Sequence, residues 1–107
     1  MVQIITDTNF SEILETDKPL LIDFWAAWCG PCRILTPTVD EIAEEFGDKI
    51  VVAKCNVDDA EEVSFRLGIR NIPTLLFIKN GQVVYRSLGV ISKAEIESKL
   101  NSMLEAV

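Results

Sequence analysis

The spacing of apolar residues along the chain changes between the period of a β-strand and that of an α-helix. Residues 20–25, Leu-Leu-Ile-Asp-Phe-Trp, are apolar except for Asp23, which is typical of a buried strand. Apolar residues then recur at helical spacing, so a long helix is expected over 29–47, with Gly47 as its stop. Pro37 falls inside this helix, where it removes a hydrogen bond and should kink the backbone. The apolar stripe of this helix comprises Ile34, Leu35, Val39, Ile42, Ala43 and Phe46.

Four other segments have the character of strands, and three others follow residues that can cap a helix. Asn80-Gly81 supplies the positive φ angles of a type I′ turn, so the strands on either side should form a hairpin. The strands are expected over 2–6, 50–57, 74–79 and 82–88. The helices are expected after Asp7 or Thr8, from Asp58 to Leu67 before Gly68, and from Ser92 onward.

Two of these helices also have the spacing of a capping box, in which a glutamate follows the capping residue by three positions. The pairs are Asp58 with Glu61 and Ser92 with Glu95. The last helix carries Ile96, Leu100, Met103 and Leu104 on one apolar stripe. The full order, β-α-β-α-β-α-β-β-α, predicts an α/β fold whose mixed sheet is covered by helices on both faces.

Composition and charge restrict the classes of function. The 107 residues are 49% hydrophobic, enough for a single domain over 1–107 to bury its own core. The net charge is −7 with no basic cluster to neutralise phosphates, so no nucleic-acid partner is expected. No apolar run approaches the roughly 18 residues of a membrane span, and no signal peptide is expected. Three unevenly placed cysteines favour a reducing compartment, most simply the cytoplasm.

The absence of histidine from the chain excludes Cys–His and Ser–His catalytic pairs and any histidine-ligated metal. A zinc site needs about four ligands, and Cys55 has no cysteine close to it in the sequence. No metal site is therefore expected, apart from the alternative of a half-site completed by a second chain.

The segment Trp28-Cys29-Gly30-Pro31-Cys32 lies where the buried strand passes into the long helix. Two cysteines at this spacing can close a small disulfide ring or open to a dithiol with little movement of the backbone. Cys29 should lie at the helix N-terminus, where free N–H groups and the helix dipole favour a thiolate. Pro31 falls in the first turn, where its missing N–H costs nothing. Because the thiolate is the species that attacks a disulfide, the segment predicts a dithiol–disulfide exchange site.

The chain resembles the thioredoxin family nearly from end to end. The residues that carry the resemblance are Asp23 to Cys32, Pro37, Ala53-Lys54, Gly68 to Thr74, Lys79-Asn80-Gly81 and Gly89. The resemblance implies a thioredoxin fold, a central five-stranded mixed sheet flanked by four helices. It also implies a monomer that reduces protein disulfides and needs no cofactor beyond its own redox-active disulfide. A dedicated thioredoxin reductase, of the NADPH–flavin or the ferredoxin type, would recycle the oxidised form.

The two cysteines are expected to have different roles. Cys29 should be the exposed nucleophile, and Cys32, one turn into the helix, the shielded thiol that resolves the mixed disulfide. The intervening Gly30-Pro31 resembles reducing members of the family, whereas oxidants and isomerases tend to carry histidine there. A thiol oxidase or isomerase of the same fold, and a non-catalytic adaptor that binds partners through the same surface, are the alternative functions.

Asp23 interrupts an apolar strand, so burial should raise the pKa of its carboxyl group. It precedes the cysteine motif at the end of the strand and could lie beneath the thiols. Together with the buried aspartate of the family, this indicates a proton acceptor for Cys32, directly or through a water. Lys54 on the neighbouring strand is the expected charge partner of Asp23, and a purely structural buried ion pair is the alternative.

Pro73 lies just before a predicted strand, where a proline suits only an edge or a turn. The resemblance implies a cis Ile72–Pro73 bond packed against the disulfide, with the backbone of Ile72 free to pair with an extended substrate segment. An ordinary trans turn is the alternative. Asn71 departs from the glycine that the family often has. The substrate surface is expected to comprise Trp28, Gly30, Pro31, Ile72, Pro73, Gly89 and Val90.

Cys55 should point to the sheet face opposite Lys54, because neighbouring residues of a strand alternate between faces. A small buried hydrophobic residue is the expected role. A regulatory thiol is the alternative.

Overall fold

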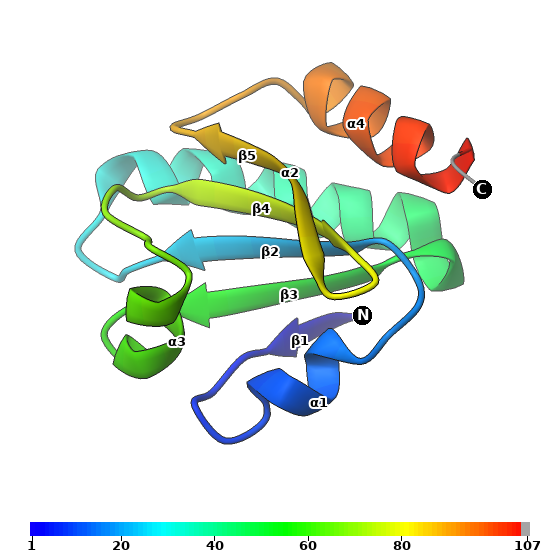
Figure 1. The fold of residues 1–107 in the computed structure, drawn as a ribbon. Coiled ribbons are helices and arrows are strands. Elements are labelled where there is room, and N and C mark those ends of the chain that lie inside the picture. The colour runs from blue at the N-terminus through cyan, green and yellow to red at the C-terminus, as the bar shows by residue number, and fades with distance from the viewer. Residues whose placement is uncertain (106–107) are drawn as a thin grey trace.

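The computed structural model describes residues 1–105 and has the predicted order of elements (Figure 1). The strands are β1 (Val2–Ile4), β2 (Leu20–Trp25), β3 (Val51–Asn56), β4 (Thr74–Lys79) and β5 (Gln82–Leu88). The helices are α1 (Phe10–Leu14), α2 (Gly30–Phe46), α3 (Glu61–Arg66) and α4 (Lys93–Glu105), with a 3-10 turn over Gly47–Lys49 after α2. The single domain expected over 1–107 includes residues 106 and 107, which lie outside the described part of the chain.

The five strands form one mixed sheet in the order β1-β3-β2-β4-β5. Strands β1, β3 and β2 are parallel, whereas β4 runs antiparallel to β2 and β5 antiparallel to β4. Strand β2 is central, so Asp23 stands in register with Lys54 of β3 on one side and with Leu75 of β4 on the other. The predicted α/β fold with five strands and four helices is confirmed.

Two hydrophobic clusters fill the two faces of this sheet, because side chains alternate along each strand. Leu21 of β2 belongs to the cluster that includes residues of α2 and α4, and its neighbour Ile22 belongs to the cluster that includes residues of α1 and α3. Asp23 is two residues from Leu21 and therefore lies on the side that α2 covers. The sheet thus places a carboxyl group beneath the helix that carries the cysteine motif.

The predicted hairpin and one predicted helix cap are confirmed. Asn80 and Gly81 have φ angles of 51° and 77°, the left-handed conformation that a type I′ turn requires. The backbone N–H of Glu95 donates to Ser92 Oγ over 3.2 Å at the start of α4, as a capping box does. Helix α2 runs through Pro37 and ends at Phe46, and its C-cap residue Gly47 has a φ of 53°.

Four local expectations are wrong. The N-cap residues of α1 and α3 are Asn9 and Ala60, in place of the predicted Asp7 or Thr8 and Asp58. Asp7 instead accepts a hydrogen bond from the backbone N–H of Val63 in α3, over 3.0 Å. The α2 stripe excludes Ile34, which is 66% exposed, and Leu104 at the end of α4 is also exposed.

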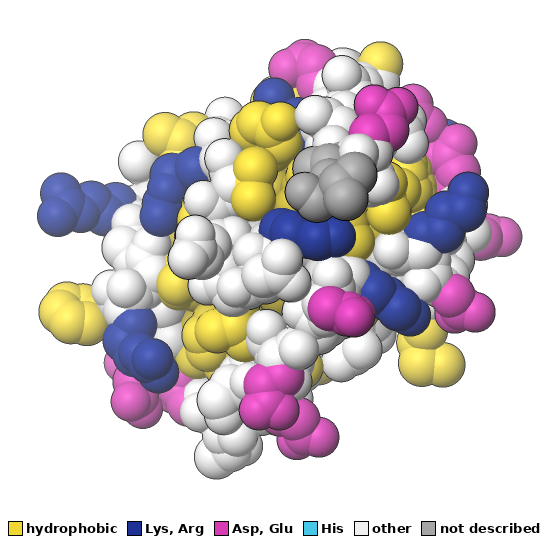
Figure 2. Space-filling view, turned by 45° about the vertical axis from the view of Figure 1, so that its right-hand side comes forward, with side chains coloured by type: hydrophobic (Ala, Val, Ile, Leu, Met, Phe, Trp, Pro, Cys, Tyr) yellow, Lys and Arg dark blue, Asp and Glu magenta, His cyan; other side chains and the backbone are white. Residues whose placement is uncertain are grey.

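Charged side chains of both signs are interspersed on the face that Figure 2 shows. Although the net charge of the chain is −7, this face is therefore not divided into one acidic and one basic region. Within residues 1–105 no helix is long and apolar enough to cross a membrane.

Candidate active site

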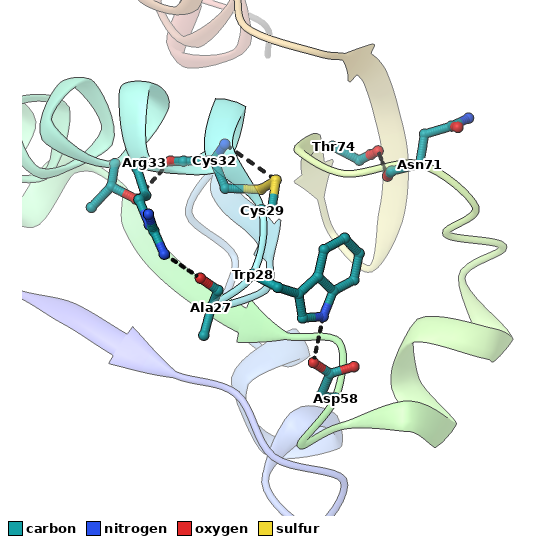
Figure 3. The surroundings of a disulfide bond; sticks show 9 residues. Ala27, Trp28, Cys29, Cys32, Arg33, Asp58, Asn71 and Thr74 are labelled. Atoms are coloured by element: carbon teal, nitrogen blue, oxygen red, sulfur yellow. Dashed lines mark hydrogen bonds between the residues drawn. A yellow bond between two sulfur atoms is a disulfide. The ribbon is translucent and has the colours of Figure 1, made fainter.

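The two motif cysteines lie where β2 passes into α2, and they form a disulfide bond (Figure 3). Cys29 is the N-cap residue of α2, and its Cα lies 5.3 Å from that of Cys32 in the first turn. The backbone N–H of Cys32 donates a hydrogen bond to Cys29 Sγ over 3.2 Å. An amide at the positive end of the helix thus points at the sulfur, an arrangement that stabilises a thiolate at Cys29 after reduction.

The disulfide is more enclosed than the sequence predicts. Cys29 is 4% exposed and Cys32 is 2% exposed, so the expectation of an exposed Cys29 is wrong for the oxidised form. Both cysteines pack with Ala26 in a small apolar cluster, against which Ile72 also packs. In the oxidised form the two cysteines therefore do not differ in exposure. They differ in that only Cys29 Sγ accepts a hydrogen bond from a helix amide among the described residues.

Asp23 is fully buried, and neither carboxylate oxygen has a hydrogen-bond partner within residues 1–105. Burial raises the pKa of Asp23 from 3.8 to about 6, because the charged form loses its hydration. The positive charge of Lys54 acts against this increase and the negative charge of Asp40 adds to it. The predicted rise in pKa is confirmed.

Lys54 stands in register with Asp23, but its ammonium group is bound elsewhere. Its Nζ lies 2.8 Å from Oδ1 of Asp40, which extends from α2. The alternative of a structural buried ion pair between Lys54 and Asp23 is therefore wrong, whereas the charge of Lys54 does act on Asp23 and opposes the rise in its pKa. Because α2 crosses this face of the sheet, it supplies a carboxylate that binds the ammonium group, and Lys54 acts on Asp23 only across space.

The loop before β4 lies against the disulfide. The Ile72–Pro73 peptide bond is cis, and the carbonyl of Pro73 accepts a hydrogen bond from Gly89 N–H over 2.8 Å. Thr74 Oγ1 donates to the carbonyl of Asn71 over 2.6 Å, which fixes the other end of the loop (Figure 3). Among the hydrogen bonds of residues 1–105, none involves the backbone N–H or C=O of Ile72. These groups remain available for pairing with another extended segment.

The predicted surface residues differ in how far they are exposed. Pro73 is buried, and Ile72 and Gly89 are partly buried. The side chains that reach solvent most are Trp28, which is 69% exposed, and Val90, which is 46% exposed. The other exposed members are Gly30 and Pro31 in the first turn of α2. Of these residues, Ile72 is the one that packs directly against the cysteines.

Two polar contacts hold the loop before α2. Nε1 of Trp28 donates to Oδ2 of Asp58 over 2.9 Å, and Nη2 of Arg33 donates to the carbonyl of Ala27 over 2.8 Å (Figure 3). Sequence reasoning assigned Asp58 to a helix cap and missed its contact with the indole. The signal was present in the sequence, because Asp58 follows β3 by two positions and the Trp28 loop follows β2. These two parallel strands are neighbours, so the segments after them lie at the same edge of the sheet.

Cys55 is fully buried on the face opposite Lys54, as predicted. Burial raises the pKa of its thiol to about 11, so the thiol stays protonated at neutral pH and is a weak nucleophile. Within residues 1–105 no three His, Cys, Asp or Glu side chains gather in a way that could hold a metal ion.

A redox-active cysteine pair at the head of a helix, above a buried carboxyl group, defines a thiol–disulfide oxidoreductase. The family model for thioredoxin matches residues 1–102 of this chain. The chain belongs to the thioredoxin family, and it is a protein-disulfide reductase.

Relatives from distant sources are similar over most of the chain. A protein named thioredoxin from Alicyclobacillus acidocaldarius is 46% identical over 101 residues, which are 94% of this chain and 96% of that protein. A thioredoxin of Haemophilus influenzae is 46% identical over 98 residues, 91% of this chain and 92% of that protein. One of Porphyra purpurea is 46% identical over 101 residues, 94% of each chain.

Proposed function

We propose that Cys29 is the attacking thiolate and Cys32 the resolving thiol of this reductase. The Cys29 thiolate attacks one sulfur of a substrate disulfide, forms a mixed disulfide and releases the first substrate thiolate, which takes a proton from water. Cys32 then loses its proton and attacks Cys29 Sγ, so the second substrate thiolate leaves. Two electrons pass to the substrate, and the chain ends with the Cys29–Cys32 disulfide.

The observation that carries this assignment is the hydrogen bond from Cys32 N–H to Cys29 Sγ. It places a helix-terminal amide on one sulfur of the pair, so that sulfur is the better thiolate. The Cys29 thiolate attacks the substrate, and in the mixed disulfide that results the Cys29 sulfur is the atom that Cys32 attacks.

Asp23 is the proton acceptor for Cys32 in this proposal, directly or through a water. Both residues are buried, and Cys32 is on the buried side of α2, which packs on the sheet face that Asp23 occupies. A pKa of about 6 leaves Asp23 mostly ionised at neutral pH and a stronger base than an ordinary aspartate.

Substrates of this reductase are protein segments in extended conformation that carry a disulfide. The free backbone groups of Ile72 would pair with such a segment, and the apolar side chains of Trp28 and Val90 would contact it without strict demands on its sequence. A thioredoxin reductase, of the NADPH–flavin or ferredoxin type, regenerates the dithiol. The protein works as a cytoplasmic monomer without a cofactor, metal or nucleic acid.

Reduction of insulin by dithiothreitol, followed by turbidity, tests this function. The protein should accelerate the reaction catalytically, and NADPH with a thioredoxin reductase should replace dithiothreitol. Cys29→Ser should abolish the acceleration, whereas the matched control Cys55→Ser should keep it because that thiol is buried and protonated. Loss of activity in the Cys55 variant with retention in the Cys29 variant would contradict the assignment.

A further inference from the structure

An unpaired buried carboxyl group stands beside an ammonium group that is bound to a different acid. Asp23 has no hydrogen-bond partner among the described residues, while Lys54, its register neighbour on β3, bonds to Asp40 of α2. A buried acid normally takes the nearest cation, because an unpaired charge in the interior is costly. The arrangement therefore needs a cause, and the cause that the structure offers is Asp40.

The three charged groups come from three elements that meet on one face of the sheet. Lys54 and Asp23 stand in register on adjacent parallel strands, so their side chains share this face. The Lys54 side chain is 15% exposed and that of Asp40 is 54% exposed, so the ammonium group is drawn outward from the core toward α2. Asp23 is left on the inner side of this ion pair.

The other neighbours of Asp23 bring no competing charge. Strand β4 places Leu75 in register with Asp23, and Leu75 is apolar and fully buried. From α2 the buried sulfur is that of Cys32, which is held in the disulfide and carries no charge in the oxidised protein. From α4 the residues buried on this face are apolar, Ile96, Leu100 and Met103. The charge on Asp23 is therefore governed by Lys54 and Asp40.

We propose that Asp40 is a positioning residue that binds the Lys54 ammonium group and thereby keeps the carboxylate of Asp23 unpaired and free to take the proton of Cys32. The inference rests on the proposed function, in which Asp23 accepts that proton. A carboxylate already bound to an ammonium group holds its charge more firmly and is a weaker base. Asp40 prevents that pairing, and its own negative charge favours protonation of Asp23 further.

Substitutions at the two ends of this ion pair should shift the titration of Asp23 in opposite directions. Asp40→Asn removes a negative charge and releases Lys54 toward Asp23, so the titration midpoint should fall by about one pH unit. Lys54→Met removes the positive charge and leaves Asp40, so the midpoint should rise. Glu44→Gln is the matched control, because it removes one negative charge from an exposed position on the same helix. Its midpoint should equal that of the parent.

The measurement is the carbon-13 carboxyl shift of Asp23 in the oxidised protein as a function of pH. Opposite shifts in the two variants support the proposal, and they cannot arise from a general loss of packing. Unchanged midpoints in both variants, or a fall in both, would overturn it. Since the Asp40 side chain is half-exposed, the Asp40→Asn variant should fold like the parent.

A second measurement separates this inference from the proton-acceptor role. Stopped-flow tryptophan fluorescence follows the oxidation of the reduced protein by insulin across pH. If Asp23 accepts the proton, the acidic limb of the rate profile moves down in pH for Asp40→Asn and up for Lys54→Met. If the Asp23 midpoints shift in opposite directions but the rate profile does not move, the positioning role of Asp40 toward Lys54 stands. The same result would overturn the role of Asp23 as the proton acceptor for Cys32.

Discussion

At the scale of single residues, the chain holds in its core a group that opposes folding when it is charged. Asp23 is fully buried with no hydrogen-bond partner among residues 1–105, so ionising it costs more in the folded protein than in the unfolded chain. That cost is also what makes it a base near neutral pH. The same desolvation therefore lowers stability and suits the carboxyl group to proton transfer.

The pH dependence of stability follows from the raised pKa of Asp23. Between its ordinary value of 3.8 and its folded value of about 6, the folded state binds more protons than the unfolded state. The contribution of Asp23 to the free energy of unfolding is therefore most favourable below pH 3.8, where both states are protonated. It falls as pH rises from 3.8 to about 6, and it is constant at higher pH. The full difference corresponds to about 3 kcal/mol.

Asp23→Ala should remove this pH dependence. Relative to the parent, the variant should gain up to about 3 kcal/mol of stability between acidic and neutral pH, because alanine has no charge to desolvate. Urea unfolding of both oxidised proteins across pH measures the difference. The cavity left by the side chain shifts the curve of the variant by a constant amount. Parallel curves for the two proteins would mean that Asp23 does not titrate within this interval.

At the scale of elements, the N-terminus of the short helix α3 is stabilised by a residue distant in the sequence. Helix α3 has no side-chain hydrogen bond from its own N-cap residue Ala60. Asp7, which lies between β1 and α1, accepts the Val63 N–H and so supplies the missing acceptor. A negative charge at this position also interacts favourably with the helix dipole. One contact thereby ties the N-terminal segment to α3.

Asp7→Ala should destabilise the protein by about 1 kcal/mol, the usual effect of losing a side-chain acceptor at a helix N-terminus. Asp17→Ala is the matched control, since it removes the same charge from an exposed position between α1 and β2. Urea denaturation at neutral pH compares the two variants with the parent. Equal effects in both would show that net charge, and not the contact with α3, is responsible.

At the scale of the whole molecule, one central sheet is shared by two separate hydrophobic clusters. Each buried strand contributes alternate residues to both, so neither cluster persists without the other face of the sheet. The cysteine motif depends on both faces as well. Helix α2 packs on one face, while Ile72, which lies against the disulfide, also packs against the cluster of the other.

Leu20→Ala and Leu21→Ala should therefore have similar effects, although the two side chains point to opposite clusters. Both leucines are fully buried, so each substitution should cost about 2–5 kcal/mol. Each variant should still unfold in one transition, with coincident curves from far-ultraviolet circular dichroism and tryptophan fluorescence. Separate transitions for the two signals in either variant would show that the two faces unfold independently.

The sequence by itself determined the features that depend on neighbouring residues. Alternation and helical spacing predicted the order of elements, and Asn80-Gly81 predicted the hairpin, because these signals act within a few residues. The cysteine pair at a helix N-terminus and the raised pKa of Asp23 were also predictable. A strand-to-helix boundary and a charge within an apolar strand are both visible in the local sequence.

Only the tertiary structure decided which distant side chains meet. Lys54 binds Asp40 fourteen positions away, Trp28 binds Asp58 thirty positions away, and Asp7 binds the Val63 amide fifty-six positions away. Each partner comes from another strand, helix or loop, and a polar side chain near one element bonds to whichever acceptor or donor the packing brings close. The burial of Cys29 has the same origin, because Ile72 reaches the disulfide from a loop more than forty positions away in the sequence. The pairing of Asp40 with Lys54, and hence the isolation of Asp23, exists only once α2 has packed on the sheet.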